Sequence, residues 1–298
     1  NYLQNNNMIT LVFLSYHSAH HIRRIMKNLD NKYQVIVMEN SSDENLKKEL
    51  EQKYKNIHVE ICRENLGFSK AMNIAIKLSK TQYVFLNPAD VDISNYVFDT
   101  LVEIIKKFNN FGLLTPSYKD RSIHSNYFIW SKKGPDLEIK INEKNFTLKE
   151  VDFIDGTILL NKNIVKNDFF DENFFIYFET MDLSKRLINK KIKLYACPEL
   201  TFDHYGGQSH DKIYNLQAKM SRNWHYNWSK FYYFKKHYNY FYALRKSLPN
   251  LLRAIKNYLK NIFATKIENK NKKILASFEI RGIVSGILQK KSNFRIKF

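Results

Sequence analysis

The sequence predicts an α/β fold with a mostly parallel sheet, followed by a basic α-helical extension. Short apolar runs and segments with helical spacing alternate four times between residues 9 and 86, which is typical of a parallel sheet with right-handed crossovers. Beyond residue 212 the spacing stays helical to the end. Residues 211–298 hold 20 of the 48 Lys and Arg but only 3 of the 29 Asp and Glu, a net charge of +17. We therefore expect one α/β domain over residues 8–210 and a basic, aromatic-rich extension over residues 211–298.

Each predicted element follows from the length and spacing of its apolar residues. Runs too short for a helix predict buried strands at residues 9–15, 34–39, 57–62, 83–86, 112–115, 151–160 and 193–198. Apolar residues three and four apart predict helices at residues 19–29, 43–54, 67–78, 94–108 and 179–189. Ser42 or Asp43 can cap the second of these helices. Residues 117–150 are polar and lysine-rich, which predicts a long loop or a β excursion, and the extension should break near Pro249 and around residues 266–273.

The composition excludes a disordered chain, because 44% of the residues are hydrophobic and 15% are aromatic. Cys62 and Cys197 lie in apolar runs without the spacing of a metal site or a disulfide framework, which fits a reducing compartment. No apolar run approaches the roughly 18 residues of a membrane span, and no signal peptide is visible. We therefore expect a cytoplasmic chain, whose basic end needs an anionic partner or surface.

The stretch from Tyr83 to Asp92 is the first candidate for a functional site. Pro88 cannot donate to a strand ladder and should end the buried strand. Asp90 and Asp92 then follow, where the ligand crevice of open α/β sheets lies. These carboxylates suit a metal ion bound to a substrate phosphate. The alternative is a turn whose aspartates only cap the helix that starts near Ser94.

Other candidate groups lie at neighbouring strand ends and at helix starts. Glu39 ends the second strand and can accept from a ribose hydroxyl or a base N–H, or it is a plain exposed acid. Asn65 precedes Gly67, which permits an unusual φ and a close backbone approach to a ligand at a helix N-terminus. The sequence has no G-x-G-x-x-G and no Walker A segment, which counts against NAD enzymes and P-loop NTPases.

A second acidic pair lies at the start of the helix at residues 179–189. Glu179 and Asp182 share one helical face, and they are either a general base for an acceptor hydroxyl or capping acids. Arg186, one turn after Asp182, can orient it. His204 stands just before two glycines, which suggest a close backbone approach, although a lone histidine is more often structural.

Eleven aromatic residues and several lysines crowd residues 222–242. This mixture is compatible with stacking on nucleic acid, with an interfacial helix at a membrane, or with packing inside the protein. Residues 248–263 and 274–288 each place apolar residues at helical spacing, with Arg and Lys between those of the first segment. We expect these two helices to rest on an anionic membrane surface or, alternatively, to pack on the protein.

Taken in order, these segments resemble the family-2 glycosyltransferases of GT-A fold, especially their rhamnosyltransferase-like branch. The segment NLGFSKAMN at residues 65–73 is similar to the family's N-x-G-F-x-x-A-x-N, and LNPAD at 86–90 is similar to its L-N-P-D. Residues 11–16, 39–43, 170–186, 204–209 and 222–237 also fit, and the likeness runs from about residue 9 to residue 237. Two positions depart from the pattern. Ala89 stands where the family has its metal-binding Asp, and Thr180 stands where its usual base follows Glu179.

The resemblance implies an inverting transfer of a sugar, such as rhamnose, from a nucleotide-diphospho-sugar to a glycan or lipid-linked acceptor, in the synthesis of a cell-surface polysaccharide. It implies a Mg²⁺ or Mn²⁺ ion bound by Asp90, Asp92 and His204, and a base at Asp182 or Glu179. The donor would be bound by Ser15, Glu39, Asn40, Asn65, Gly67, Asn73, Asn87 and Arg186.

The enzyme would then lie in the cytoplasm, peripheral at the inner face of the cell membrane. One alternative is an impaired family member that acts as a scaffold, because of Ala89 and Thr180. The other is a nucleic-acid-binding protein, which the placement of the positive charge outside the α/β domain disfavours, so we expect no nucleic acid as a partner.

Overall fold

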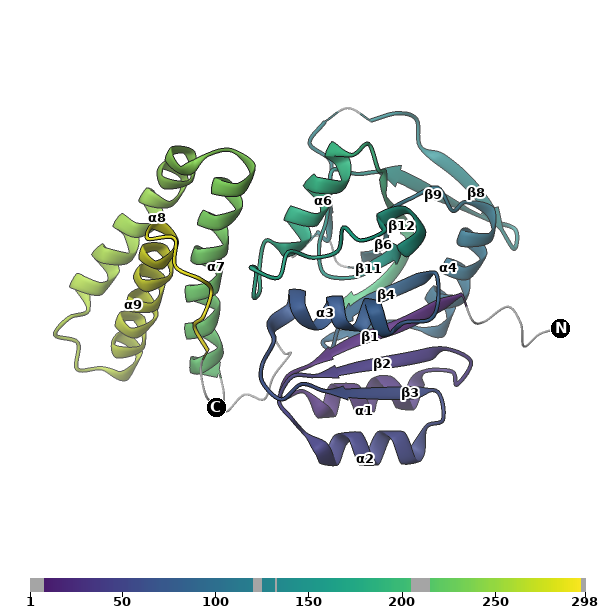
Figure 1. Ribbon diagram of the computed structural model, residues 1–298, viewed down its shortest axis with the longest axis horizontal. Helices are drawn as coiled ribbons and strands as arrows, with labels where there is room; N and C mark the ends of the chain where they lie inside the picture. Colours follow the sequence, from purple (N-terminus) through teal and green to yellow (C-terminus); the bar gives the residue numbers. More distant parts are fainter. Residues whose placement is uncertain (1–7, 120–124, 132, 205–214, 296–298) are drawn as a thin grey trace. The chain divides into compact units, whose positions relative to one another are not determined.

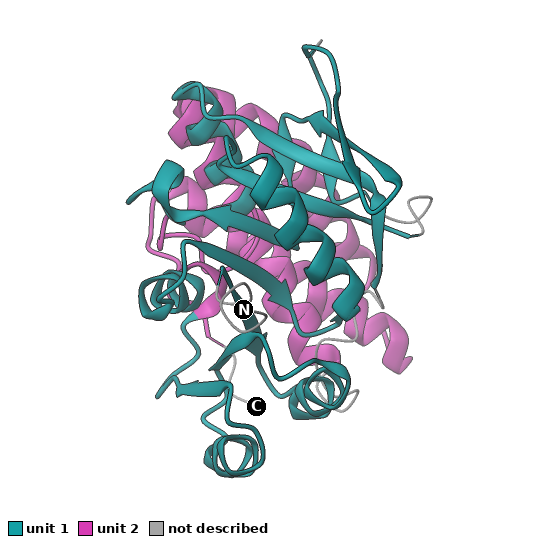
Figure 2. Ribbon diagram, turned by 90° about the vertical axis from the view of Figure 1, so that its right-hand side faces the viewer, with its two compact units in different colours: residues 1–66, 70–170, 180–210 teal, residues 67–69, 171–179, 211–298 magenta. Residues whose placement is uncertain are grey.

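The computed structural model describes residues 8–119, 125–131, 133–204 and 215–295 (Figure 1). The chain divides into two compact units, coloured separately in Figure 2. Unit 1 comprises residues 1–66, 70–170 and 180–210, and unit 2 comprises residues 67–69, 171–179 and 211–298.

Unit 1 is built on one large mixed sheet, whose strands run in the order β3-β2-β1-β4-β11-β6-β12-β9-β8. The first four strands in this order are parallel to one another, β11 is antiparallel to both its neighbours, and β12 is parallel to β6. The strands are β1 (Ile9–Ser15), β2 (Gln34–Glu39), β3 (Ile57–Ile61), β4 (Tyr83–Pro88), β5 (Val91–Asp92), β6 (Leu113–Tyr118), β7 (Tyr127–Phe128), β8 (Leu137–Ile141), β9 (Lys144–Glu150), β10 (Phe153–Ile154), β11 (Ile158–Asn161) and β12 (Leu194–His204). The helices are α1 (Ala19–Asn28), α2 (Glu44–Lys53), α3 (Gly67–Leu78), α4 (Asn95–Lys107), α5 (Lys162–Val165) and α6 (Glu179–Asn189).

The predicted alternation of strands and helices is confirmed from β1 to α4, because the apolar spacing there is strong and the ends carry clear signals. The side chain of Asp43 caps α2 by accepting from the N–H of Leu46 at 3.0 Å. Pro88 is the last residue of β4, as predicted. Alternate residues of β1, β2 and β4, including Phe13, Val37 and Phe85, are buried in one core with apolar residues of α1, α2 and α4.

Two predicted strands in unit 1 need correction, and one alternative that the sequence pattern left open is resolved. Residues 151–160 form two strands, because Gly156 adopts φ +70° between β10 and β11. Residues 193–198 form only the first half of β12, which continues through a bulge after Cys197 to His204. For residues 117–150 the alternative of a β excursion is confirmed, because the described part of that segment contains β7, β8 and β9.

Unit 2 is dominated by the helices α7 (Asn215–His237), α8 (Tyr240–Lys260) and α9 (Ile267–Ile287). A Cβ at Gly282 would lie 2.2 Å from the carbonyl oxygen of Trp224, so the glycine allows α9 to approach the backbone of α7 closely. Trp224 and Trp228 of α7 form a cluster with Phe278 of α9. For these α7 aromatics, the packing interpretation of the aromatic segment is therefore confirmed.

The helix breaks predicted in the extension do not lie where the sequence pattern placed them. Pro249 lies inside α8, on its exposed side, where water can satisfy the carbonyl that loses its partner. Residues 267–273 belong to α9, and the break lies at residues 261–266. No helix in the described ranges is long and apolar enough to span a membrane.

Candidate active site

Polar side chains gather where β1, β2 and β4 end. Ser15 lies opposite Glu39 in the parallel pairing of β1 with β2, and the backbone N–H of Asn40 donates to the carbonyl oxygen of Ser15 at 2.8 Å. Leu14 lies opposite Pro88, so β4 delivers Asp90 to the same edge. The structure thus brings Ser15, Glu39 and Asn40 together at the carboxyl edge of the sheet.

The Glu39 carboxylate holds the turn that follows β2. It is buried, and one of its oxygens accepts from the backbone N–H of Ser41 at 2.6 Å and from the Ser41 hydroxyl. Its other oxygen accepts no hydrogen bond from the described residues. That oxygen can accept from a hydroxyl or an N–H of a ligand at the strand edge.

The turn after β4 carries Asp90, which is 5% exposed. The fully buried side chain of Asn87 donates to the carbonyl oxygen of Val91 at 3.1 Å and accepts from the hydroxyl of Thr157 at 2.9 Å. These two bonds fix the turn on both sides of Asp90. Asn87 therefore positions the acid, and its amide is engaged within the protein.

Asp92 and His204 lie beside this turn for a different reason. The short strand β5 pairs with the end of β12, which places Asp203 opposite Asp92 and His204 opposite Val91. The sequence pattern could not reveal this pairing, because it predicts that the last strand ends at residue 198, before His204. Asp92 also forms an ion pair with Arg24 of α1, in which Nη2 of Arg24 lies 3.0 Å from Oδ1 of Asp92. Part of the negative charge of Asp92 is therefore already balanced.

Asp155, an exposed acid in the turn between β10 and β11, is not among the candidates that the sequence pattern indicated. Burial raises the pKa of Tyr118, and the negative charges of Asp155 and Asp90 raise it further. The charges of both carboxylates are therefore close enough to the Tyr118 hydroxyl to raise its pKa. The signal that could have found Asp155 is the Asp-Gly pair inside an apolar run, since such a glycine often marks a break in a strand.

Asp182 lies in α6 but is fully buried. Its Oδ2 accepts from Nε of Arg186 at 2.8 Å, as the one-turn spacing predicted. Arg186 also donates to the backbone carbonyl oxygens of Asp168 and Phe169. The guanidinium thus ties α6 to the preceding segment, and Asp182 is its buried counter-ion. Glu179, the first residue of α6, is 6% exposed.

The predicted donor-binding residues around α3 are occupied mainly with the protein itself. Gly67 has the unusual φ expected of it, +74°, but its close neighbour is the backbone of Phe175, whose oxygen would lie 2.3 Å from an added Cβ. The amide of Asn73 donates to the carbonyl oxygen of Phe170 at 2.8 Å and accepts from its N–H at 3.0 Å. Asn65 is half-buried just before α3.

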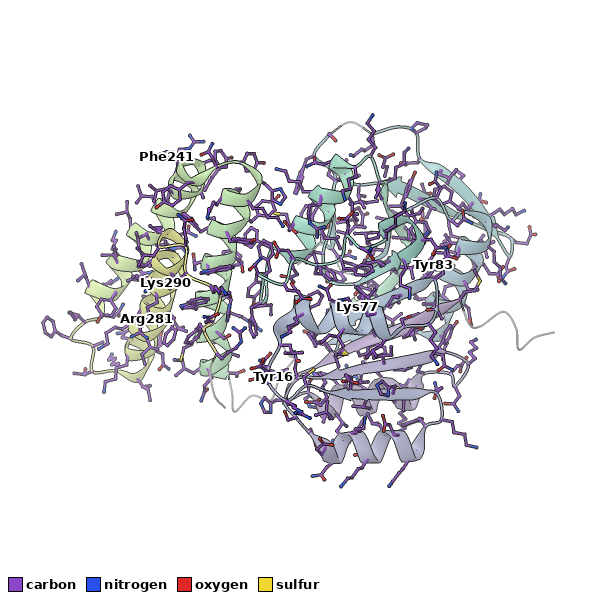
Figure 3. All side chains as sticks on the ribbon, in the orientation of Figure 1. Tyr16, Lys77, Tyr83, Phe241, Arg281 and Lys290 are labelled. Carbon is purple, nitrogen blue, oxygen red and sulfur yellow. The ribbon has the colours of Figure 1, made fainter. Side chains whose placement is uncertain are left out.

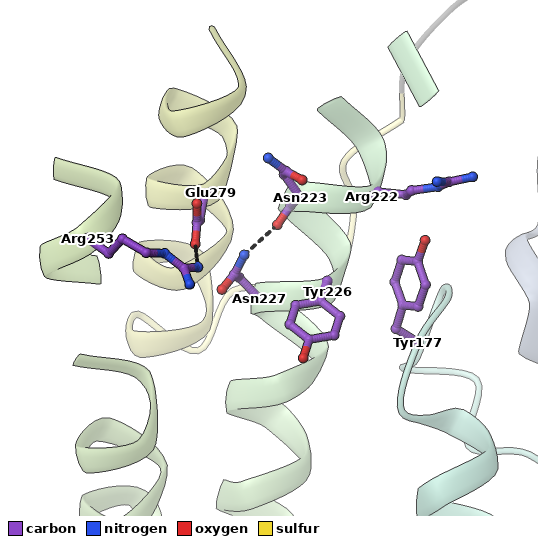
Figure 4. Close-up of a pocket in the computed structure, with 7 residues that line it drawn as sticks. All are labelled: Tyr177, Arg222, Asn223, Tyr226, Asn227, Arg253 and Glu279. Carbon is purple, nitrogen blue, oxygen red and sulfur yellow. Dashed lines mark hydrogen bonds and ion pairs between the residues drawn. The ribbon is translucent and has the colours of Figure 1, made fainter. Parts of the chain in front are cut away.

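Unit 2 contains a pocket of its own, with a volume of about 300 Å³ (Figure 4). Its lining residues are Tyr177, Arg222, Asn223, Tyr226, Asn227, Arg253 and Glu279. Arg253 and Glu279 form an ion pair of 2.6 Å across α8 and α9. Tyr177 adopts φ +71°, and its ring meets that of Tyr226 edge-on at 5.8 Å. Ring faces beside amide and charged groups suit a polar ring such as a sugar.

The edge at Asp90 fits a cation that is shared with a ligand. In the described residues, no three His, Cys, Asp or Glu side chains cluster as a metal site. Asp90 supplies a buried carboxylate, and the backbone of His204 runs beside it. Mg²⁺ and Mn²⁺ commonly bind through one or two carboxylates and complete their shell with phosphate oxygens and water. These residues therefore fit a divalent ion held jointly by the protein and a diphosphate.

Comparison with known proteins agrees with this geometry. The model of the family described as Glycosyl transferase family 2 matches residues 10–169. The chain is 23% identical over 247 residues to the rhamnosyltransferase WbbL of Escherichia coli (strain K12), covering 73% of this chain and 89% of that protein.

Two solved structures are similar in fold. A mannosyltransferase from Pyrobaculum calidifontis, PcManGT, in complex with GDP-Man and Mn²⁺, gives a TM-score of 0.55 at 12% identity over 95% of this chain and 88% of that one. GalNAc-T7 with UDP, GalNAc and Mn²⁺ gives a TM-score of 0.51 at 14% identity, over 77% of this chain and 51% of that one. The family match covers more than half of the chain, and it includes the strand ends that carry Ser15, Glu39 and Asp90. The chain therefore belongs to glycosyl transferase family 2 and has the GT-A fold, with a rhamnosyltransferase-like sequence.

Proposed function

We propose that the chain transfers a sugar from a nucleotide-diphospho-sugar to a hydroxyl of a glycan or lipid-linked acceptor, with inversion at the anomeric carbon. The observation that carries this proposal is the convergence of Ser15, Glu39 and Asp90 at one carboxyl edge of the sheet. That edge is where ligands bind in open α/β sheets. The similar structures contain GDP-Man or UDP, each with Mn²⁺, which supports a nucleotide-sugar donor here. The similarity to WbbL makes nucleotide-linked rhamnose the first donor to test, and surface-polysaccharide synthesis the first pathway.

Glu39 is the residue that we assign to the nucleoside of the donor. Its available oxygen can accept from a ribose hydroxyl or a base N–H, while Ser15 and Asn40 shape the neighbouring strand ends. Asn65 lies before the start of α3, where backbone N–H groups attract an anion. Asn73, Asn87 and Arg186 would act indirectly, by fixing the segments around the site.

The developing charge on the diphosphate is the main electrostatic problem of this reaction. We assign Asp90 as the principal protein ligand of a Mg²⁺ or Mn²⁺ ion, with Asp92 and His204 beside it. When bound, such an ion stabilises negative charge on the leaving diphosphate. The buried position of Asp90 favours this role, because burial removes much of the water around a carboxylate, and a nearby cation then stabilises its negative charge.

The acceptor side of the proposal involves unit 2. We assign the pocket that Tyr177 and Tyr226 line in unit 2 to a sugar ring of the acceptor, since aromatic faces and fixed polar groups recognise such rings. We further propose that α8 rests on an anionic membrane surface. Its exposed side carries a stripe of five apolar residues on one face, each at least 38% exposed, namely Phe241, Leu248, Leu252, Ile255 and Leu259.

The experiment that tests the donor site is thermal unfolding in the presence of UDP-, GDP- and dTDP-linked sugars, with and without MnCl₂. One of these donors should raise the unfolding temperature in a Mn²⁺-dependent way, because a ligand that binds only the folded state stabilises it. Asp90→Asn should abolish the Mn²⁺-dependent part and keep the fold, since the amide has the same shape. Asp136→Asn, in an exposed ion pair with Lys149, is the matched control.

Two outcomes would count against the proposal. If no donor stabilises the parent chain, the donor site is wrong. If Asp90→Asn binds the diphosphate in the presence of Mn²⁺ as well as the parent does in calorimetry, Asp90 is not the metal ligand. A parent that binds a donor and never turns it over would instead favour the scaffold alternative.

A further inference from the structure

We propose that Asp155 is the general base that removes the proton from the attacking hydroxyl. This assignment rests on the proposed function and names the residue that performs its proton transfer. From the sequence alone, the base could be either Glu179 or Asp182. Asp155 comes from a different element, the turn between β10 and β11, and meets the chemical requirements better than Asp182 does.

Two hydrogen bonds orient the Asp155 carboxylate and leave one of its oxygens available. The hydroxyl of Thr180 donates to Oδ1 at 2.9 Å, and the backbone N–H of Gly156 donates to the same atom at 2.9 Å. In the described residues, Oδ2 accepts no hydrogen bond, and the side chain is exposed. A general base needs such an oriented carboxylate with one oxygen within reach of the acceptor hydroxyl.

The turn that carries Asp155 is also tied to the turn that carries Asp90. Thr157, two residues after Asp155, donates to the side chain of Asn87, which in turn holds the carbonyl of Val91. Tyr118 lies against the same turn, because a Cβ at Gly156 would lie 2.7 Å from its hydroxyl. The exposed carboxylate is therefore fixed next to the strand edge that we assign to the donor diphosphate.

The first turns of α6 brace Asp155 from the other side. Thr180 and Ser184 are one helical turn apart and both are buried. Ser184 accepts from the N–H of Ile154 at 3.3 Å, while Thr180 donates to Asp155. Thr180 is thus a positioning residue. A hydroxyl there can hold the carboxylate by donating to it, which a methyl group in its place could not do.

Asp182 is poorly suited to the same task. It is fully buried, and its ion pair with Arg186 would have to break before it could reach an acceptor. Removing a carboxylate from a buried ion pair leaves an uncompensated charge and is strongly unfavourable. Asp182 therefore serves to hold Arg186 and the segment at residues 168–169.

The transfer step balances with Asp155 as the proton acceptor. A lone pair of the acceptor oxygen forms the new C–O bond at the anomeric carbon, and the proton of that hydroxyl passes to Oδ2 of Asp155. The bond from the anomeric carbon to the diphosphate oxygen breaks on the opposite face. Its electron pair leaves with the nucleoside diphosphate, so no other reactant is needed.

The test measures release of nucleoside diphosphate with water as the acceptor, from each UDP-, GDP- or dTDP-linked sugar that stabilises the parent with MnCl₂. Asp155→Asn keeps the acceptor atom Oδ1 and should fold normally, but it should slow release roughly 10²–10⁴-fold. Donor affinity in calorimetry should stay within about threefold of the parent, because the lost interaction belongs to the transition state. Asp136→Asn, exposed in the same unit, is the control and should match the parent.

Variants of Thr180 separate positioning from a purely structural role. Thr180→Val should slow release on the order of tenfold without loss of donor affinity, whereas Thr180→Ser, which can still donate, should restore the parent rate. Release by Asp155→Asn at the parent rate would overturn the assignment, and so would a loss of donor affinity at unchanged turnover. If the parent binds none of the donors, the proposed function itself is refuted, and the assignment of Asp155 as its general base is refuted with it.

Discussion

At the scale of single residues, backbone conformation decides how Gly67 is used. The sequence pattern suggested a close approach to a ligand, but the backbone beside Gly67 belongs to Phe175, whose carbonyl oxygen also accepts from the N–H of Phe68 at 2.7 Å. The glycine therefore joins the start of α3 to the segment at residues 171–179 within unit 2. The role of Gly67 is therefore structural, because it lets the start of α3 contact Phe175 closely.

Gly67→Ala should destabilise the protein by about 1–3 kcal/mol, because alanine is strained at φ +74° and its Cβ would clash with the carbonyl oxygen and the ring of Phe175. Urea unfolding measures the change. Gly134→Ala is the matched control, since nothing lies within 4 Å of a Cβ at Gly134. Equal stability of the Gly67 variant and the parent would show that the two segments are not in contact in solution.

At the scale of elements, α7 depends on a buried neutral histidine. His225 is 0% exposed, stacks on Phe175 with ring centroids 4.4 Å apart, and bonds the carbonyl oxygen of Phe294 through Nε2 at 3.0 Å. Burial, and then the positive charge of Arg295, lower the pKa of His225 to about 3. Between pH 6.5 and about 3 the unfolded chain therefore binds a proton at this residue that the folded unit does not bind.

Unit 2 should accordingly lose stability as the pH falls below about 6.5, by up to about 1.4 kcal/mol per pH unit from this one group. Fluorescence of Trp224 and Trp228 during urea unfolding at pH 7.5, 6.5 and 5.5 reports the change. His225→Gln should flatten this dependence, whereas His58→Gln, at an exposed position in unit 1, should leave it unchanged. An unaltered slope in His225→Gln would mean that another group controls the acid sensitivity.

At the same scale, two helices with similar sequence patterns have different partners. The apolar residues Phe278 and Ile283 of α9 are buried in unit 2, so for these residues of α9 the alternative of packing on the protein is confirmed. In α8 the buried side is formed by Ala243, Ser247 and Ala254. The opposite side carries the stripe of five apolar residues defined above. Phe241, labelled in Figure 3, is 79% exposed.

At the scale of the whole molecule, net charge governs the surface to which α8 would bind. The +17 of residues 211–298 is concentrated in the same part of the chain as the exposed stripe. Arg245, Lys256 and Lys260 are exposed beside it, and the stretch described as α8 contains no acidic residue. Anionic headgroups contribute on the order of 1 kcal/mol per nearby basic side chain, screened by salt.

The chain should therefore bind vesicles of anionic lipid in a salt-sensitive way and bind neutral vesicles weakly. The double variant Leu252→Ser/Leu259→Ser should weaken binding roughly tenfold or more, as expected when two buried apolar side chains are removed from the interface. Leu78→Ser, at an exposed position in unit 1, is the control. Truncation after Tyr242 is a poorer test, because it also removes α9, which packs on α7. Equal co-sedimentation of the double variant and the parent would exclude this surface.

The sequence by itself determined the elements whose signals are local. Strand and helix spacing from β1 to α4, the cap at Asp43 and the stop at Pro88 depend on neighbours within a few residues, so they can be read directly from the chain. It also indicated that Glu39 and Asp90 share a sheet edge, because parallel strands end on the same side.

Only the tertiary structure decided what each polar or apolar group meets. Asn73 and Asn87 carry the residue type of ligand-binding amides, yet Asn73 donates to the backbone of Phe170, 97 residues away, and Asn87 accepts from the hydroxyl of Thr157, 70 residues away. The exposed carboxylate of Asp155 meets Thr180 across 25 residues, and no local pattern encodes such a contact. Periodicity likewise shows that a helix has an apolar face, but the atoms that cover that face come from other elements. Only the folded chain therefore shows that apolar residues of α9 are buried while the stripe on α8 is exposed.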